Sequence, residues 1–128
     1  MTDRIELTTP ISRAFEPVIR MVMGGIADRL DLGFEDLDDL QLAVERLLAE
    51  GDPSDPVTLS FEILDRGVRT RVGPLRDVSL AAALQGPDPR PGELTLPRIL
   101  STVVDAYGVE QVQDGHLVVR LEKARRGA

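Results

Sequence analysis

Apolar residues recur along the first 72 residues with two different periods, which predict helices and strands. Where they recur every three or four residues, the period indicates a helix with one buried face. Where they alternate with polar residues, the period indicates a strand with one face against the core. The predicted helices cover residues 15–30 and 37–48, and the predicted strands cover residues 3–9, 57–64 and 68–72.

The rest of the chain completes a mixed order of helices and strands. The last two of the strands above flank a short turn and form a hairpin. The order of elements lacks a regular alternation of strand and helix, so it predicts an α+β two-layer sandwich, in which helices cover one face of a single sheet. The further predicted elements are a short helix at 74–84, a proline-rich loop at 85–93, a third main helix from Leu96 to Tyr107 that ends at Gly108, and a second hairpin of strands 109–113 and 116–122.

Two adjacent glycines, Gly24 and Gly25, interrupt the first predicted helix. Each weakens a helix by up to about 1 kcal/mol relative to alanine. They either let a neighbouring element approach closely or end the helix early, and the pattern leaves both interpretations open.

The length and composition indicate one domain over residues 1–128. A chain of 128 residues can bury a core without disulfides, and this one has no cysteine. No apolar run approaches the roughly 18 residues that a membrane span needs. The first ten residues carry Asp3, Arg4 and Glu6, unlike a signal peptide. We therefore expect a soluble cytoplasmic protein without a membrane partner.

The net charge of −7 is unevenly distributed. Residues 1–64 hold 14 acidic and 5 basic side chains, whereas residues 65–128 hold 8 acidic and 10 basic ones. An acidic half repels phosphate backbones, so nucleic acid is not an expected partner and a basic protein is. With one histidine, His116, and no cysteine, the chain has no ligand set typical of zinc, and no metal site is expected.

A cluster of acids at the start of the second predicted helix has two interpretations. Asp36, Asp38 and Asp39 lie where backbone N–H groups favour negative charge, so they can simply satisfy the helix and keep it soluble. They can also form a docking face that attracts a basic protein. Met23, beside the two glycines, is the candidate apolar contact of such a face, because methionine adapts its shape to a partner.

Four stretches, taken in order, resemble the anti-sigma serine-kinase family of the RsbW type, within the histidine-kinase-like ATPase domains. They are RIELTTPISRAFEPVIRMVMGGIADRLDL, FEDLDDLQLAVERLL, VTLSFEILDRGVRTRV and LTLPRILSTVVDAYGVEQVQDGHLVVRLEK, which together span about 3–122. The resemblance implies a mixed five-stranded sheet and a homodimer paired through the sheet edge and first helix. It also implies a regulator that holds a sigma factor away from RNA polymerase. A small anti-anti-sigma partner reverses this binding, and active members phosphorylate that partner with ATP.

The residues that would handle ATP in that family are altered here. In that family this helix offers a carboxylate as general base, and aligning LAVER with the family's LAVDE places Glu45, the catalytic candidate, at the acidic first position and Arg46 at the position usually held by glutamate. Arginine has no acceptor and is not a base at neutral pH. Glu50 falls where the family holds magnesium with asparagine. The alternative for these three is a solvated face with an Arg46–Glu50 ion pair.

The two glycine-containing parts of the family's nucleotide site are altered as well. Asp77 stands where an aspartate would bind adenine, but no glycine follows it before Gly86. Gly92 is the only glycine in the stretch PRPGELTLPRI that leads into the third main helix, where several would let the backbone cradle phosphate, and Glu93 adds a negative charge.

These alterations favour a protein that binds other proteins and has lost ATP binding, with no cofactor expected. The alternative is an active serine/threonine kinase that uses ATP and magnesium, with Glu45 as catalytic base and Glu50, Asp77 and Gly92 at the nucleotide. A third interpretation is a scaffold domain whose partner is not a sigma factor.

Overall fold

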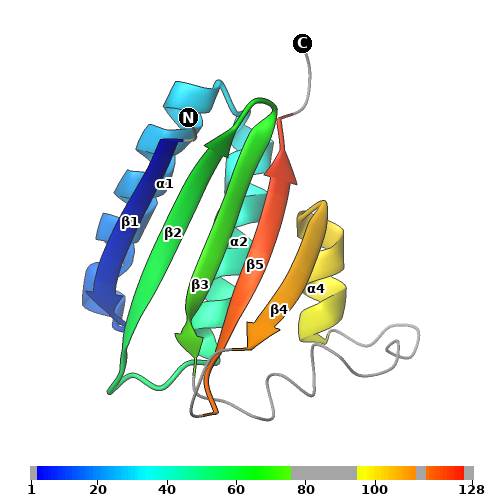
Figure 1. Ribbon diagram of the computed structural model, residues 1–128. Helices are drawn as coiled ribbons and strands as arrows, with labels where there is room; N and C mark the ends of the chain where they lie inside the picture. Colours follow the sequence, from blue (N-terminus) through cyan, green and yellow to red (C-terminus); the bar gives the residue numbers. More distant parts are fainter. Residues whose placement is uncertain (1–2, 76–94, 112–114, 126–128) are drawn as a thin grey trace.

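A computed structural model describes residues 3–75, 95–111 and 115–125 of the protein (Figure 1). The elements are β1 (Asp3–Pro10), a 3₁₀ turn η1 (Arg13–Phe15), α1 (Glu16–Leu30), α2 (Phe34–Ala49), β2 (Pro56–Leu64), β3 (Gly67–Leu75), α4 (Leu96–Val103), β4 (Ala106–Gln111) and β5 (Leu117–Ala124). None of the described helices combines the length and the apolar character needed to cross a bilayer.

The five strands form one sheet in the order β1-β2-β3-β5-β4. All four neighbouring pairs are antiparallel, so the mixed sheet implied by the family resemblance is wrong for the described strands. The reason lies in the position of β5. Strands β3 and β4 run in the same direction, but β5 lies between them and is antiparallel to both, so no parallel pair forms.

Helices α1, α2 and α4 lie on one face of the sheet, as Figure 1 shows. The predicted α+β two-layer arrangement is therefore confirmed. The core fills the space between the layers, where alternate strand residues meet the apolar sides of the helices. Its most deeply buried large side chains are Leu47, Leu59, Phe61, Leu75, Leu100 and Leu121.

Helix α1 continues without a break through Gly24 and Gly25. Its buried side is formed by Ile19, Met23, Ile26 and Leu30. A Cβ atom added at either glycine would meet nothing within 4 Å outside the helix's own backbone. Neither interpretation of the two glycines holds in the described structure, because they neither end the helix nor admit a neighbour.

The hairpin of β2 and β3 is confirmed, with Glu62 opposite Arg69 and both strands longer than predicted. Strand β3 continues to Leu75, so the first two residues of the predicted helix at 74–84 are extended. The rest of that helix and the loop at 85–93 lie outside the described residues.

The third main helix ends earlier than its apolar period predicted. α4 stops at Val103, and Val104 is already extended, with φ −122° and ψ 160°. The prediction that the helix includes Tyr107 is wrong: Tyr107 pairs with Leu121 in the second hairpin. Asp105 fixes this change of direction, since its backbone N–H donates to the Glu122 carbonyl oxygen and its carboxylate accepts from Ala124 N.

Candidate functional site

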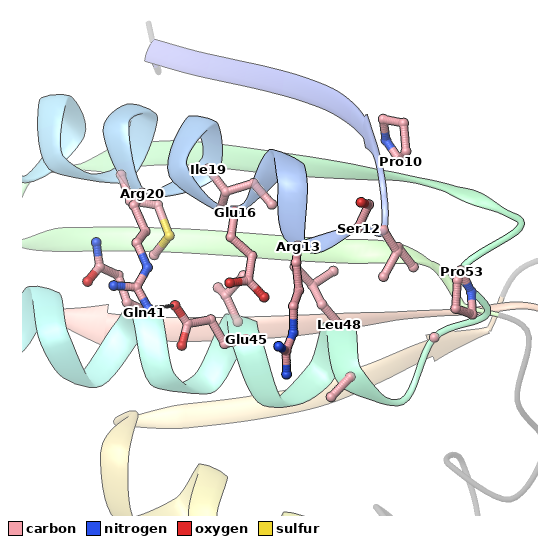
Figure 2. Close-up of a pocket in the computed structure, with 15 residues that line it drawn as sticks. Pro10, Ser12, Arg13, Glu16, Ile19, Arg20, Gln41, Glu45, Leu48 and Pro53 are labelled. Carbon is pink, nitrogen blue, oxygen red and sulfur yellow. Dashed lines mark ion pairs between the residues drawn. The ribbon is translucent and has the colours of Figure 1, made fainter.

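A cavity of about 400 Å³ opens between the start of α1 and the end of α2 (Figure 2). Its floor is apolar, because both helices turn part of their buried side toward it. The floor residues are Ile19, Met23, Val44 and Leu48. Small-molecule sites in proteins are mostly concave, mostly apolar and about 300–1,000 Å³ in volume, so this cavity has the size and lining of a ligand site.

Four charged side chains surround this cavity. Figure 2 shows Arg13, Glu16 and Arg20 from the η1–α1 segment, and Glu45 from α2, in the space between the two helices. Arg20 and Glu45 are joined across the helices by an ion pair of 2.6 Å. Arg13 and Glu16 form no ion pair with any residue that the structure describes. The rim thus carries one neutralised pair and two single charges of opposite sign.

Glu45, the candidate general base, lies in this cavity on the side of α2 that faces α1. Its Oε1 atom is buried and lies 2.6 Å from the Arg20 guanidinium. The structure thus gives Glu45 a partner that the sequence pattern did not predict.

Arg46 and Glu50 are both exposed, and Glu50 is the C-cap residue of α2. The predicted ion pair between them is absent, since within the described parts of the chain neither side chain has an ion-pair partner. The ion pair near the end of α2 is instead formed by Glu45 with Arg20 of α1. Asp77 and Gly92, the other two nucleotide candidates, lie outside the described residues.

The acidic cluster at the start of α2 is divided between the interior and the surface. Asp36 is buried, and its carboxylate lies 3.7 Å from the ammonium of Lys123. Asp39 is half-exposed and lies 3.3 Å from the same ammonium, which also donates to the Val103 carbonyl oxygen at 2.8 Å. Asp38 is exposed. Of the three acids proposed for partner binding, Asp38 is therefore the exposed one.

The exposed methionine of α1 is Met21 and not Met23. Met23 is 2 % exposed, because it shares the buried side of the helix with Ile19 and Ile26. Met21 is 76 % exposed. A partner that contacts this helix from outside would meet Met21. The prediction that Met23 is the exposed apolar contact is therefore wrong.

The open face of the sheet carries a network of charges that the sequence analysis did not identify. Arg71 reaches Glu62 on β2 at 2.5 Å and Glu110 on β4 at 3.3 Å. Arg69 joins Glu122 at 3.1 Å, and Arg120 lies 3.3 Å from Glu110. The alternation of charged and apolar residues in these strands indicated a charged outer face. Which arginine pairs with which glutamate depends on the register of four strands, which the sequence pattern does not give.

The network perturbs two of its members. The hydrogen bond from Arg71 holds the pKa of the Glu62 carboxyl below its usual value of 4.5, and the positive charges of Arg71 and Arg69 add to this. The same hydrogen bond raises the pKa of the Arg71 guanidinium above its usual value. Three arginines and three glutamates balance each other, so this face is polar without a net charge.

No known protein-family model matches the chain, and no curated protein is significantly similar to it.

Proposed function

We propose that the protein is a regulatory domain of the anti-sigma type, built on a histidine-kinase-like ATPase fold, which acts by binding proteins and has lost ATP binding. The expected partners are a sigma factor, an anti-anti-sigma protein, or both. The observation that carries the proposal is a row of apolar and acidic side chains on the outside of α2. Phe34, Asp38 and Leu42 are four residues apart, so they lie along one exposed side of that helix.

The exposure of this row is unusual for its chemistry. Phe34 is 82 % exposed and Leu42 is 42 % exposed, although both are large apolar side chains. Aromatic residues are enriched at surfaces that bind proteins, and exposed apolar patches with a polar rim mark such surfaces. We define Phe34, Asp38 and Leu42 as the α2 row. Its acid would attract a basic partner, and its apolar residues would supply contact area.

The loss of ATP binding is supported by the end of α2. Magnesium needs hard oxygen ligands in a fixed geometry. Here Arg46 supplies only donors, and Glu50 caps an exposed helix end, where nothing in the described structure fixes its carboxylate. Glu45 is engaged by Arg20.

We further propose a homodimer through the free edge of β1 and the outer side of α1. β1 pairs with β2 on one edge, and no described strand pairs with its other edge. Ile5 on β1, Phe15 at the end of η1, and Val18 and Met21 on the outer side of α1 are exposed apolar side chains. An edge strand bordered by apolar side chains favours pairing with another copy.

The partner is tested by capture from the native cell and by identification of the retained proteins. The wild-type chain should retain a sigma factor or its small antagonist, and a variant with Phe34→Asp and Leu42→Asp should retain neither. Thr102→Asp, on the exposed side of α4, is the matched control and should behave like wild type. Retention of neither class by the wild-type chain contradicts the proposal, as does equal retention by the α2-row variant.

Steering by charge needs a variant that leaves the fold intact. Because Asp36 and Asp39 hold Lys123, reversing them would disturb the interior. Asp38→Lys with Glu35→Lys changes exposed positions only. It should slow association with the identified partner at low salt and much less at high salt, because salt screens exposed charges. Identical rates at low salt would exclude steering by these acids.

Loss of ATP binding is tested by calorimetric titration with MgATP. We expect no heat of binding at micromolar nucleotide. A clear micromolar heat would instead support the alternative of an active serine/threonine kinase, which transfer of labelled phosphate to the captured partner would then establish.

A further inference from the structure

We propose that the cavity between α1 and α2 binds an apolar α-amino acid, with the charged ends of the ligand on Arg13 and Glu16 and its side chain on the cavity floor. This inference is independent of the proposed partners, because it concerns a small ligand of the isolated protein. It rests on the charges at the rim, on the Glu45 carboxylate beside them and on the apolar floor.

The two single charges at the rim are of opposite sign and one helical turn apart. Residues at i and i+3 are neighbours on a helix, yet no ion pair joins Arg13 to Glu16. Figure 2 shows both side chains extending from the η1–α1 segment toward α2. A zwitterion can bind both at once: its carboxylate accepts from the Arg13 guanidinium, and its ammonium donates to the Glu16 carboxylate.

Glu45 adds a second acceptor for the ammonium end. Its carboxylate lines the cavity, and although Oε1 lies 2.6 Å from the Arg20 guanidinium, a carboxylate has further lone pairs that can accept a hydrogen bond from a ligand. The pair with Arg20 keeps Glu45 in place and cancels its charge. One net negative and one net positive group therefore remain at the rim, which suits a ligand with both charges and no net charge.

The floor selects for an apolar side chain. Ile19, Met23, Val44 and Leu48 are all buried, and they present carbon and sulfur atoms to the cavity. A ligand with a polar side chain would leave its polar atoms unpaired on this floor, which is unfavourable. The thioether of Met23 can adjust to side chains of different shapes. We therefore expect leucine-like side chains to bind better than short or polar ones.

The test is an NMR titration of the ¹⁵N-labelled full chain with L-leucine. Amide signals of residues around the cavity should shift in a saturable manner. Two analogues separate the charged ends: 3-methylbutylamine lacks the carboxylate, and 4-methylpentanoate lacks the ammonium. Each should bind at least about tenfold more weakly than L-leucine, because each loses one charged hydrogen-bonding end.

Substitutions at the cavity test whether L-leucine binds there. Arg13→Gln and Glu16→Gln are changes of exposed side chains, and each should weaken L-leucine binding by about tenfold. Their matched controls are Arg46→Gln and Glu50→Gln, which are exposed residues outside the cavity and should leave the affinity unchanged. Ala49→Phe, at the cavity wall, should block binding, whereas Ala14→Phe, outside the wall, should not.

The outcomes are decisive in both directions. Saturable shifts at the cavity that require both charged ends support the proposal. No saturable shift with L-leucine at millimolar concentration overturns it, as does equal binding of the amine or the acid alone. Binding that persists in Arg13→Gln and Glu16→Gln, with amide spectra otherwise like wild type, also overturns the assignment of the two ends.

Discussion

Lys123 on β5 lies 3.7 Å from the carboxylate of Asp36 on α2, and both side chains are buried. The ammonium also binds the last carbonyl group of α4, at Val103. One lysine therefore joins a strand to two helices at the same end of the sheet. Because a buried charge without a partner is costly, these contacts must be kept together or removed together.

Lys123→Met should destabilise the protein by about 3 kcal/mol, because it removes the ammonium that faces the buried Asp36 carboxylate and the Val103 carbonyl oxygen. Urea unfolding followed by circular dichroism measures the change. Adding Asp36→Leu to Lys123→Met should recover part of the loss, since the buried negative charge is removed as well. A loss below about 1 kcal/mol for the single variant would show that the ion cluster contributes little.

Gly24→Ala and Gly25→Ala should each stabilise the protein by up to about 1 kcal/mol. The helix continues through both positions, and an added Cβ meets no neighbouring element. Thermal unfolding compares them with Gly67→Ala, which is the opposite case, because its Cβ would overlap the Lys123 carbonyl oxygen. Destabilisation by Gly24→Ala would show that the described packing around α1 is incomplete.

Thr70→Val should stabilise the protein by about 1 kcal/mol. The Thr70 hydroxyl on β3 is fully buried and has no hydrogen-bond partner within the described ranges, and valine has nearly the same shape without the polar atom. Thr58→Val serves as the control. The Thr58 hydroxyl forms a hydrogen bond of 2.8 Å with the Thr8 hydroxyl, so its removal should not stabilise the protein. Destabilisation by Thr70→Val in urea unfolding would indicate a partner for this hydroxyl.

The lowered pKa of Glu62 predicts a specific dependence of stability on pH. A carboxyl whose pKa is lower in the folded state contributes stability above its unfolded value, and that contribution is lost as the pH falls through the folded value. Glu62→Gln should therefore be less stable than wild type at pH 7, and the difference should shrink below about pH 4.5. Unfolding series at pH 7 and pH 3 measure it, with Glu50→Gln as control. A constant difference would contradict the assignment.

The proposed homodimer predicts that two charge variants pair with each other. In an antiparallel pair of β1 strands centred on Ile5, Arg4 faces the partner's Glu6. Arg4→Glu alone and Glu6→Arg alone place like charges opposite each other, so each should be monomeric at concentrations where wild type is dimeric. Their mixture places opposite charges together and should restore a dimer, which light scattering measures. A monomeric wild type would exclude this interface.

The elements that the sequence predicted well are those whose period reflects burial alone. α1, α2 and the hairpin of β2 and β3 bury one face each, so their apolar spacing indicated them directly. The boundary of α4 was missed because Tyr107 is four residues after Val103, a spacing that fits a helix equally well. The pairing of Tyr107 with Leu121 is decided by the sheet and not by local pattern.

The candidate site was less predictable because its contacts join distant parts of the chain. Glu45 was identified, but its partner Arg20 depends on how α1 packs on α2. Asp36 was interpreted as a surface acid, since the lysine that accompanies it into the interior comes much later in the sequence. A charged residue is expected outside unless a partner is known, so such buried pairs are missed from sequence.

The place of β5 in the sheet has a consequence for synthesis on the ribosome. β5 follows β4 in the chain but lies between β4 and β3, so β4 has no described neighbour until β5 is present. During translation the earlier strands and helices emerge first, yet the layer cannot close around Leu121 and Lys123 until β5 has left the exit tunnel. The nascent domain therefore completes its fold late, and a release or stall before β5 would expose an unfinished edge to chaperones and proteases.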